Sequence, residues 1–155
     1  MKTIHNMAIV ALLLAGSDVY AGSGVQAVKQ TLQGYEQAWS RHDGPAIASF
    51  YYEPAMRVSK AGPLVRSTRA AEEAFFDGFV QLLVVKGYDH SDWQVLHVHL
   101  LNARTAIASG VVTRYRRDGS ILQRQGVTYD LWRTDQGWKI FLSATHAPQS
   151  ALQFH

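Results

Sequence analysis

The sequence contains no cysteine, so no disulfide can hold this 155-residue chain together. Its stability must come from core packing or dimerisation, and an apolar content of 47% is ample for a core. Neither sign of charge is in large excess, because 15 basic and 12 acidic residues leave a formal net charge of +3. A balance this mild does not indicate nucleic-acid binding. The densest basic run, Arg114, Arg116 and Arg117, adjoins the turn signal Asp118-Gly119 and is interpreted as a solvated hairpin tip.

The sequence also lacks an apolar run of the roughly 20 residues that cross a bilayer. Its N-terminal apolar segment extends from Met7 to Ala15, after Lys2 and before a more polar stretch that closes in Val19-Tyr20-Ala21. This order is typical of a cleavable signal peptide. We therefore predict a signal peptide over residues 1–21, cleaved near Ala21, with one domain over residues 22–155. The expected location is periplasmic or secreted, without stable membrane insertion, and the alternative is an uncleaved anchor or a buried first helix.

Apolar residues spaced three and four apart predict helices in the first half of the mature chain. The clearest stripe consists of Val25, Val28, Leu32, Tyr35 and Trp39. A second, shorter helix is expected from Asp43 or Gly44 through Tyr51. A third is expected from a cap at Ser67 or Thr68 to Gly87, with an apolar face of Ala71, Phe75, Phe79 and Leu82. Two short strands, residues 56–60 and 64–66, lie between the second and third helices.

From Trp93 onward the apolar period changes from about 3.6 to about 2, which predicts β-strands. Four strands are expected, over residues 93–101, 105–117, 120–134 and 138–146. Asp118-Gly119 is a strong two-residue hairpin signal, and Asp135-Gln136-Gly137 predicts the next hairpin. Helices followed by an antiparallel meander whose one face they can cover indicate the α+β class.

Three segments carry a resemblance to a known group of proteins: Tyr35-Glu-Gln-Ala-Trp-Ser-Arg-His-Asp43, Phe50-Tyr-Tyr-Glu-Pro-Ala-Met-Arg-Val-Ser59 and Tyr129-Asp-Leu-Trp-Arg-Thr-Asp-Gln-Gly-Trp-Lys139. They resemble the nuclear transport factor 2-like superfamily, the cone-shaped fold of ketosteroid isomerase and SnoaL-like polyketide cyclases. The resemblance covers essentially all of the mature chain. It implies three N-terminal helices packed on a curved, mostly antiparallel sheet in a barrel-like cone. Because the superfamily includes isomerases, dehydratases, cyclases, hydrolases and members without chemistry, the resemblance leaves the function open.

Comparison with ketosteroid isomerase implies roles for individual residues. Tyr35 matches the tyrosine of an oxyanion hole, and Asp130 matches a carboxylic acid that stays protonated and donates a second hydrogen bond. Ser59 falls where the isomerase has its carboxylate base, and a serine without activation cannot abstract a carbon-bound proton at neutral pH. The resemblance therefore implies an oxyanion site but makes the steroid isomerase mechanism doubtful.

Tyr35 and Asp130 each also have an interpretation without function, which follows from the helix or strand on which the residue is expected to lie. Tyr35 lies on the apolar stripe, where its hydroxyl group can serve a purely structural hydrogen bond. Strand alternation places Asp130 on one face with Thr128 and Trp132, while Tyr129 and Leu131 lie on the other. A carboxylate is costly to bury unless it is paired or protonated, so an outward, solvated Asp130 is the alternative to a pocket residue.

Several histidines are further candidates. His146, near the chain end, is a candidate acid or base close to neutral pH. His97 and His99 point to the same side of one strand, a spacing that metal sites use. Their side also carries Trp93 and Val95, which favours a homodimer face over a metal site. No metal and no other cofactor is expected.

The sequence supports two classes of function. The first is an exported domain that binds a small apolar or aromatic molecule in a pocket containing Tyr35 and Asp130. The expected ligand-binding residues are Trp39, Tyr51, Ser59, Phe75, Phe79 and Trp132. An enzyme variant of this hypothesis is an isomerase, dehydratase or cyclase that stabilises an enolate or oxyanion, with His146 as its base. The second class is an accessory subunit that acts by protein association.

Overall fold

The computed structural model describes residues 12–154, with side chains from residue 22 onward. The helices are α1 (Leu12–Ser40), α2 (Gly44–Ser49) and α3 (Arg69–Val85), and the strands are β1 (Tyr51–Ser59), β2 (Gly62–Arg66), β3 (Tyr88–Asn102), β4 (Thr105–Arg116), β5 (Ile121–Thr134) and β6 (Gly137–His146). A short 3-10 helix, η1 (Pro148–Ser150), follows β6. None of the helices in residues 12–154 has the length and apolar character of a membrane span.

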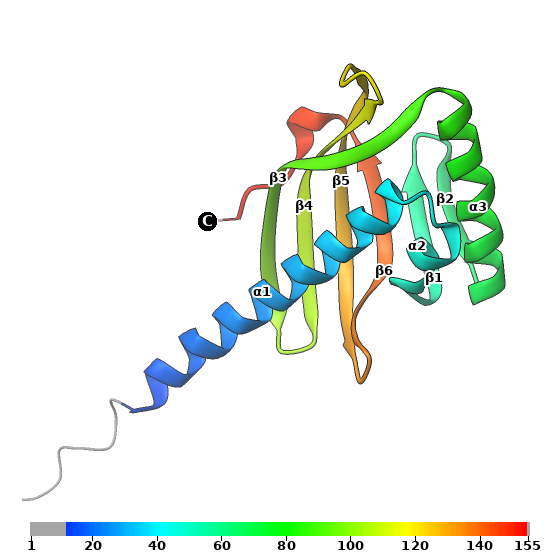
Figure 1. Cartoon of the computed structure of the whole chain (residues 1–155). Helices are drawn as coiled ribbons and strands as arrows, with labels where there is room; N and C mark the ends of the chain where they lie inside the picture. The colour runs from blue at the N-terminus through cyan, green and yellow to red at the C-terminus, as the bar shows by residue number, and fades with distance from the viewer. Residues whose placement is uncertain (1–11, 155) are drawn as a thin grey trace, which may run out of the picture.

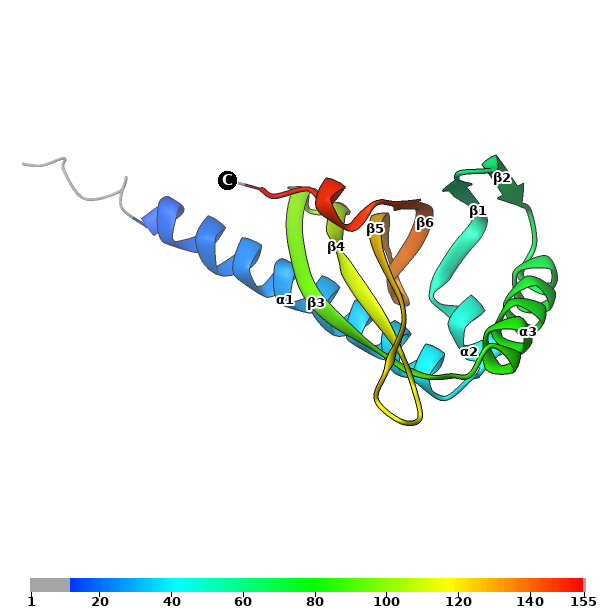
Figure 2. The same cartoon turned by 90° about the horizontal axis from the view of Figure 1, so that it is seen from above.

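The six strands form one curved, mixed sheet in the order β2-β1-β6-β5-β4-β3. Only the pairing of β1 with β6 is parallel, and all other neighbours are antiparallel. Helix α1 crosses one face of the β3 to β6 region, while α2 and α3 stand at the end formed by β1 and β2 (Figure 1). The last residues of the chain run over the opposite face (Figure 2). The predicted α+β fold, with three helices on a curved and mostly antiparallel sheet, is confirmed.

The helix α1 begins earlier than its apolar stripe predicts. It starts at Leu12 and continues through Ala21 without a break, whereas residues 1–11 of the predicted signal peptide lie outside the described residues. Among the described side chains, the buried core begins at Val28. The stripe from Val28 to Trp39 is buried as predicted, because it faces the sheet.

The two later helices start at the predicted caps. The Asp43 side chain accepts a hydrogen bond from the Ala46 amide at 2.9 Å, and Thr68 accepts one from the Ala71 amide at 3.2 Å. The apolar face predicted for α3 is wrong, because the observed buried face is shifted by about one residue around the helix. Leu82 is 62% exposed, whereas Phe76, Val80 and Leu83 are buried. Phe75 and Phe79 lie at the edge of the buried face, half exposed, and are free to border a cavity.

A β-bulge in β3 changes which side chains face the helices. The register with β4 shifts between Trp93 and Val95, so strict alternation from Trp93 fails. Trp93 turns inward and meets the Tyr129 ring at 6.2 Å, while His97 keeps the outward direction. Gly110 on β4 permits the bulge, because a Cβ there would lie 2.1 Å from the Val95 carbonyl oxygen. The prediction that Trp93 and His97 share an outer face is therefore wrong.

Candidate functional site

A small enclosed space, the inner chamber, lies between α1 and the sheet. Its volume is about 20 Å³, which is room for about one water molecule. Polar and aromatic side chains from α1, β1, β4, β5 and β6 line it, among them Tyr35, Glu36, Trp39, Tyr51, Arg57, Arg114, Gln125, Tyr129, Ser143 and Thr145.

A larger space, the outer hollow, adjoins the inner chamber. Its volume is about 530 Å³, and its walls include Ser59, Arg66, Phe75 and Phe79. Three residues line both spaces, namely Arg57 of β1, Gln125 of β5 and Thr145 of β6. The inner chamber and the outer hollow therefore lie side by side at these three residues, which we call their junction, and we refer to the two spaces together as the cone cavity.

Three tyrosines form the apolar and hydrogen-bonding wall of the inner chamber. The Tyr35 and Tyr51 hydroxyl oxygens are 3.1 Å apart, and the Tyr35 and Tyr129 rings meet edge to face at 5.7 Å. Burial raises the pKa of Tyr35 well above its ordinary value, and burial does the same for the pKa of Tyr129. Both hydroxyl groups therefore stay protonated at neutral pH and can donate hydrogen bonds.

Glu36 is the buried carboxyl group of the inner chamber. Its residue is only 8% exposed, and burial raises its pKa from 4.5 to about 7, against the opposing effects of the Ser91 hydroxyl and the Arg114 guanidinium. Its Oε1 atom has no hydrogen-bond partner among the described residues. A carboxyl group with this pKa can both hold and release a proton near neutral pH.

Arg114 brings a buried positive charge to the same chamber. Its Nη1 atom donates to the Gln123 side-chain oxygen at 3.0 Å, and its guanidinium lies 5.2 Å from the Trp39 ring centre. Burial lowers the pKa of Arg114, but an arginine remains charged at neutral pH. Its Nε atom and the Ser143 hydroxyl, like Glu36 Oε1, have no partner in the described part of the chain.

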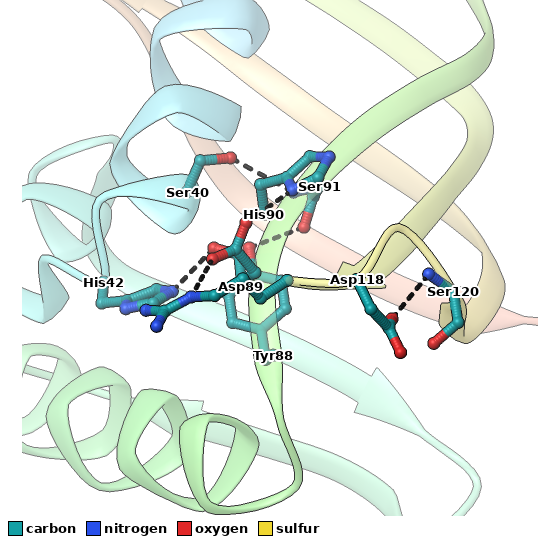
Figure 3. A network of polar contacts seen from close by, with 9 residues as sticks. Ser40, His42, Tyr88, Asp89, His90, Ser91, Asp118 and Ser120 are labelled. Carbon is teal, nitrogen blue, oxygen red and sulfur yellow. Dashed lines mark hydrogen bonds and ion pairs between the residues drawn. The ribbon is translucent and has the colours of Figure 1, made fainter.

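Hydrogen bonds at the end of α1 fix the β3 residues beside Glu36. The Tyr88 and Ser91 hydroxyl oxygens are 2.6 Å apart, and the Ser91 amide donates to the Ser40 hydroxyl at 3.2 Å. His42 Nε2 donates to the Asp89 carbonyl at 2.8 Å (Figure 3). Burial raises the pKa of Tyr88 to about 12. This network joins α1 to the start of β3 and holds Ser91 at the chamber wall.

Glu36 is also reached from a second side. A groove of about 540 Å³ between α1 and β3 is lined by Glu36, Ser91, Lys29, Asp92 and Trp93. Both Glu36 and Ser91 thus belong to the groove and to the inner chamber. Glu36 therefore borders both the groove and the inner chamber.

The predicted site residues divide into two groups. Tyr35, Trp39 and Tyr51 line the inner chamber, and Ser59, Phe75 and Phe79 line the outer hollow. Asp130, Trp132 and His146 line neither space. The structure does not bring Tyr35 and Asp130 together.

Strand alternation explains the place of Asp130. Tyr129 and Leu131 are buried on the side that faces the helices, so Asp130 lies on the outer face of β5. Partial burial there raises its pKa. His146 is on that face too, where its Nε2 atom is 2.9 Å from the Thr128 hydroxyl and Nδ1 donates to the Ala147 carbonyl at 2.9 Å.

The remaining candidates lie away from the cone cavity. Trp132 borders a separate shallow hollow with Tyr52, Pro54 and Phe141. His99 stacks on Phe154 at 5.4 Å on the outer sheet face. Within residues 12–154, no three histidine or acidic side chains are grouped closely enough to hold a metal ion.

Solved structures from several bacteria share this fold. An NTF2-like protein with a cystatin-like fold from Novosphingobium aromaticivorans superposes with a TM-score of 0.75 and 16% identity, covering 95% of this chain and 100% of its own. An NTF2-like candidate dehydratase from Streptomyces avermitilis gives a TM-score of 0.63 at 16% identity, covering 82% and 96%. A ketosteroid isomerase-like protein from Erwinia carotovora atroseptica gives 0.57 at 14% identity, covering 78% and 93%.

The superpositions establish the fold, but at sequence identities this low they establish no activity. No curated protein is similar enough in sequence to count as a relative. The family model for the NTF2-like protein DUF6841 matches residues 26–148, which is most of the chain. The protein is therefore a member of the NTF2-like family DUF6841.

Proposed function

We propose that the protein binds a small, planar and largely apolar molecule in the cone cavity, with a polar edge of the ligand directed toward Tyr35. The observation that carries this proposal is the set of three unpartnered polar atoms around one chamber, Glu36 Oε1, Arg114 Nε and Ser143 Oγ. Buried polar groups in proteins are almost always hydrogen-bonded, and each one left without a partner costs about 1–3 kcal/mol. A ligand oxygen at the inner chamber would provide the missing partner.

The shape of the cavity favours an apolar ligand body. The inner chamber is too small for more than a polar tip, whereas the outer hollow has the volume of a small-molecule site. The rings of Phe75 and Phe79, which stack 5.7 Å apart, line its wall with apolar surface. The ligand body therefore belongs in the outer hollow, and its polar group belongs at the junction with the inner chamber.

Catalysis is the second candidate function, and Glu36 favours it. Enolisation of a ketone needs a base with a pKa near the working pH and hydrogen-bond donors for the developing oxyanion. Glu36 has a pKa of about 7, and the hydroxyl groups of Tyr35 and Tyr51 lie in the same chamber. In this hypothesis Glu36 replaces the base that Ser59 does not supply, and Tyr35 donates to the oxyanion.

Thermal unfolding against a panel of planar phenols, steroids and polyketide-like ketones tests the binding proposal. A ligand that binds only the folded state at a hundredfold excess over its Kd stabilises it by about 2.7 kcal/mol. We expect Thr145→Trp, which places a large ring at the junction, to abolish that stabilisation. The control Asp130→Asn, on the outer face, should keep it. Stabilisation that survives Thr145→Trp would place the ligand elsewhere.

Deuterium exchange at the α-carbon of a bound ketone distinguishes catalysis from binding alone. If Glu36 acts as the base, Glu36→Gln should lower the exchange rate by about a hundredfold or more while the ketone still binds. A wild-type protein that binds the ketone without accelerating exchange would contradict the enzyme hypothesis and leave the binding proposal intact.

We also propose that residues 1–21 are removed on export and that the outer sheet face around His97 supports a homodimer. Among the described side chains, which begin at Gly22, the buried core begins at Val28. Intact mass of the protein recovered from the periplasm or the medium should correspond to a start at Gly22, and a full-length mass would contradict processing.

Light scattering tests the proposed homodimer. It should give twice the chain mass, and a monomer would rule out the dimer.

A further inference from the structure

Three arginines border the cone cavity, and their charges are balanced to different degrees. Arg66 donates from Nε to Glu72 at 2.8 Å, in a buried ion pair. Arg114 shares the inner chamber with Glu36, and their charges interact. Arg57 has no carboxylate partner among the described residues. When Glu36 is ionised, Arg57 is therefore the one cavity arginine among the described residues without a protein counter-charge, and when Glu36 is protonated Arg114 lacks one too.

We propose that the ligand of the cone cavity is an aromatic carboxylate, and that Arg57 binds its carboxylate group at the junction of the inner chamber and the outer hollow. This inference rests on the proposed function and gives it a ligand class. An arginine guanidinium is the preferred partner of carboxylates, because its planar fork can donate two parallel hydrogen bonds.

The position of Arg57 suits an anchor for such a ligand. Its guanidinium lies 5.2 Å from the Phe75 ring centre and 5.5 Å from that of Phe79, which holds the charge against the apolar wall of the outer hollow. The residue is half-buried and lines both spaces. A carboxylate on Arg57 would extend toward the unpartnered Arg114 Nε, while the aromatic body packs on the two phenylalanines.

Arg66 is a weaker candidate for the same role. Its guanidinium lies 3.8 Å from the Phe75 ring centre, but its charge is already neutralised by Glu72. Binding a ligand carboxylate to Arg66 would compete with that ion pair. Arg57 pays no such cost, because no protein carboxylate has to be displaced.

Glu36 should couple this binding to pH. When Glu36 is ionised, its negative charge in the inner chamber repels a ligand carboxylate, so binding favours the protonated form. The other titratable or charged groups that interact with Glu36 are Arg114 of β4, Asp92 and Tyr88 of β3, and Tyr129 of β5. Lys29 of α1 shares the groove on its other side. Ligand affinity should therefore fall as the pH rises through the pKa of Glu36, which is about 7.

Calorimetric titration with 2-naphthoate and 2-naphthamide tests the ligand class, because the two probes share one aromatic body and differ in charge. We expect wild type to bind the carboxylate at least about tenfold more tightly than the amide. Arg57→Gln should abolish that preference, and Arg57→Lys, which keeps the charge but loses the fork, should retain part of it. Lys60→Gln, which removes an exposed positive charge from the neighbouring turn, is the matched control and should keep the preference.

The outcomes separate this inference from the proposed function. Equal affinity for the two probes, or a preference that persists in Arg57→Gln, would overturn the inference and leave the binding proposal standing. The same holds if only neutral ketones or phenols bind. If no compound binds the cone cavity, the proposed function fails and the inference fails with it.

The pH dependence supplies a second readout. The naphthoate carboxylate stays ionised from about pH 6 to about pH 8.5, so any change in its affinity over that range reports on the protein. We expect about a tenfold loss of affinity across this range, proton uptake on binding near neutral pH, and neither effect in Glu36→Gln. Affinity that is independent of pH in wild type would overturn the coupling to Glu36.

Discussion

Replacing Glu36 with glutamine is expected to stabilise the protein at alkaline pH and to change its stability little in acid. Burial raises the pKa of Glu36 from 4.5 to about 7, so between these values the native protein holds a proton that the unfolded chain has released. The free energy of unfolding therefore falls as the pH rises through this window, by on the order of 3 kcal/mol. Glutamine keeps the shape of the protonated acid and avoids this loss.

Urea unfolding of wild type and Glu36→Gln at about pH 4 and about pH 8 measures the effect. The difference between the two proteins should be small at the lower pH and close to its full value at the higher pH. Glu73→Gln, the same substitution on a half-exposed residue of α3, is the matched control and should show neither change. A gain of equal size at both pH values would show that Glu36 is not a buried acid with a raised pKa.

A stability gain at this position would also indicate function. A buried carboxyl group that lowers stability at neutral pH needs some other reason to be kept, and binding or catalytic sites often sacrifice stability in this way. The unpartnered Oε1 atom is part of the same cost. Loss of naphthoate coupling together with higher stability in Glu36→Gln would connect both effects to one carboxyl group.

The helical half of the fold could be predicted from the sequence because its apolar stripe is long and regular. That stripe also contained the signal for Glu36, which the sequence analysis missed. Glu36 lies four residues after Leu32 and three before Trp39, on the face that packs against the sheet. An acidic residue at a core position of a helix indicates a buried carboxyl group.

The position of Asp130 illustrates the limit of a match to another family. The strand and its two faces were predicted correctly, with Tyr129 and Leu131 opposite Asp130. The pattern itself does not say which face meets the helices, and the resemblance favoured the face that carries Asp130. The burial of Tyr129 and Leu131 shows that their face, and not the face of Asp130, meets the helices. A single step along a strand exchanges inside and outside, so a match in sequence position can be off by a whole face.

Arg114 was missed for a different reason. The run of arginines before Asp118-Gly119 was interpreted as one solvated hairpin tip, but its members have different surroundings. Arg116 stays at the tip, where Nη1 donates to the Ile121 carbonyl at 3.0 Å. Arg114, two residues earlier, is buried beside Trp39. Only the path of β4 over α1 distinguishes them, and that path depends on tertiary packing.

Glu72→Gln is expected to destabilise the protein by about 3 kcal/mol, because it leaves the buried charge of Arg66 without its counter-charge. The Arg66 Nε and Glu72 Oε2 atoms are 2.8 Å apart, with side chains 9% and 4% exposed. Arg66 Nη1 already lacks a partner in the described part of the chain, so no second acceptor stands ready. A double-mutant cycle with Arg66→Met should show that the double variant loses less stability than the sum of the two single variants.

The same substitution should affect ligand binding in the opposite direction. Once Glu72 is neutral, Arg66 becomes a second unbalanced cation on the wall of the outer hollow, 3.8 Å from the Phe75 ring centre. Naphthoate should then bind several-fold more tightly to Glu72→Gln than to wild type, while naphthamide should not. Lower stability with unchanged naphthoate affinity would mean that Arg66 is a structural ion-pair partner only. Lower stability with higher affinity for the carboxylate alone would mean that the unbalanced charge of the cavity decides which ligands it accepts.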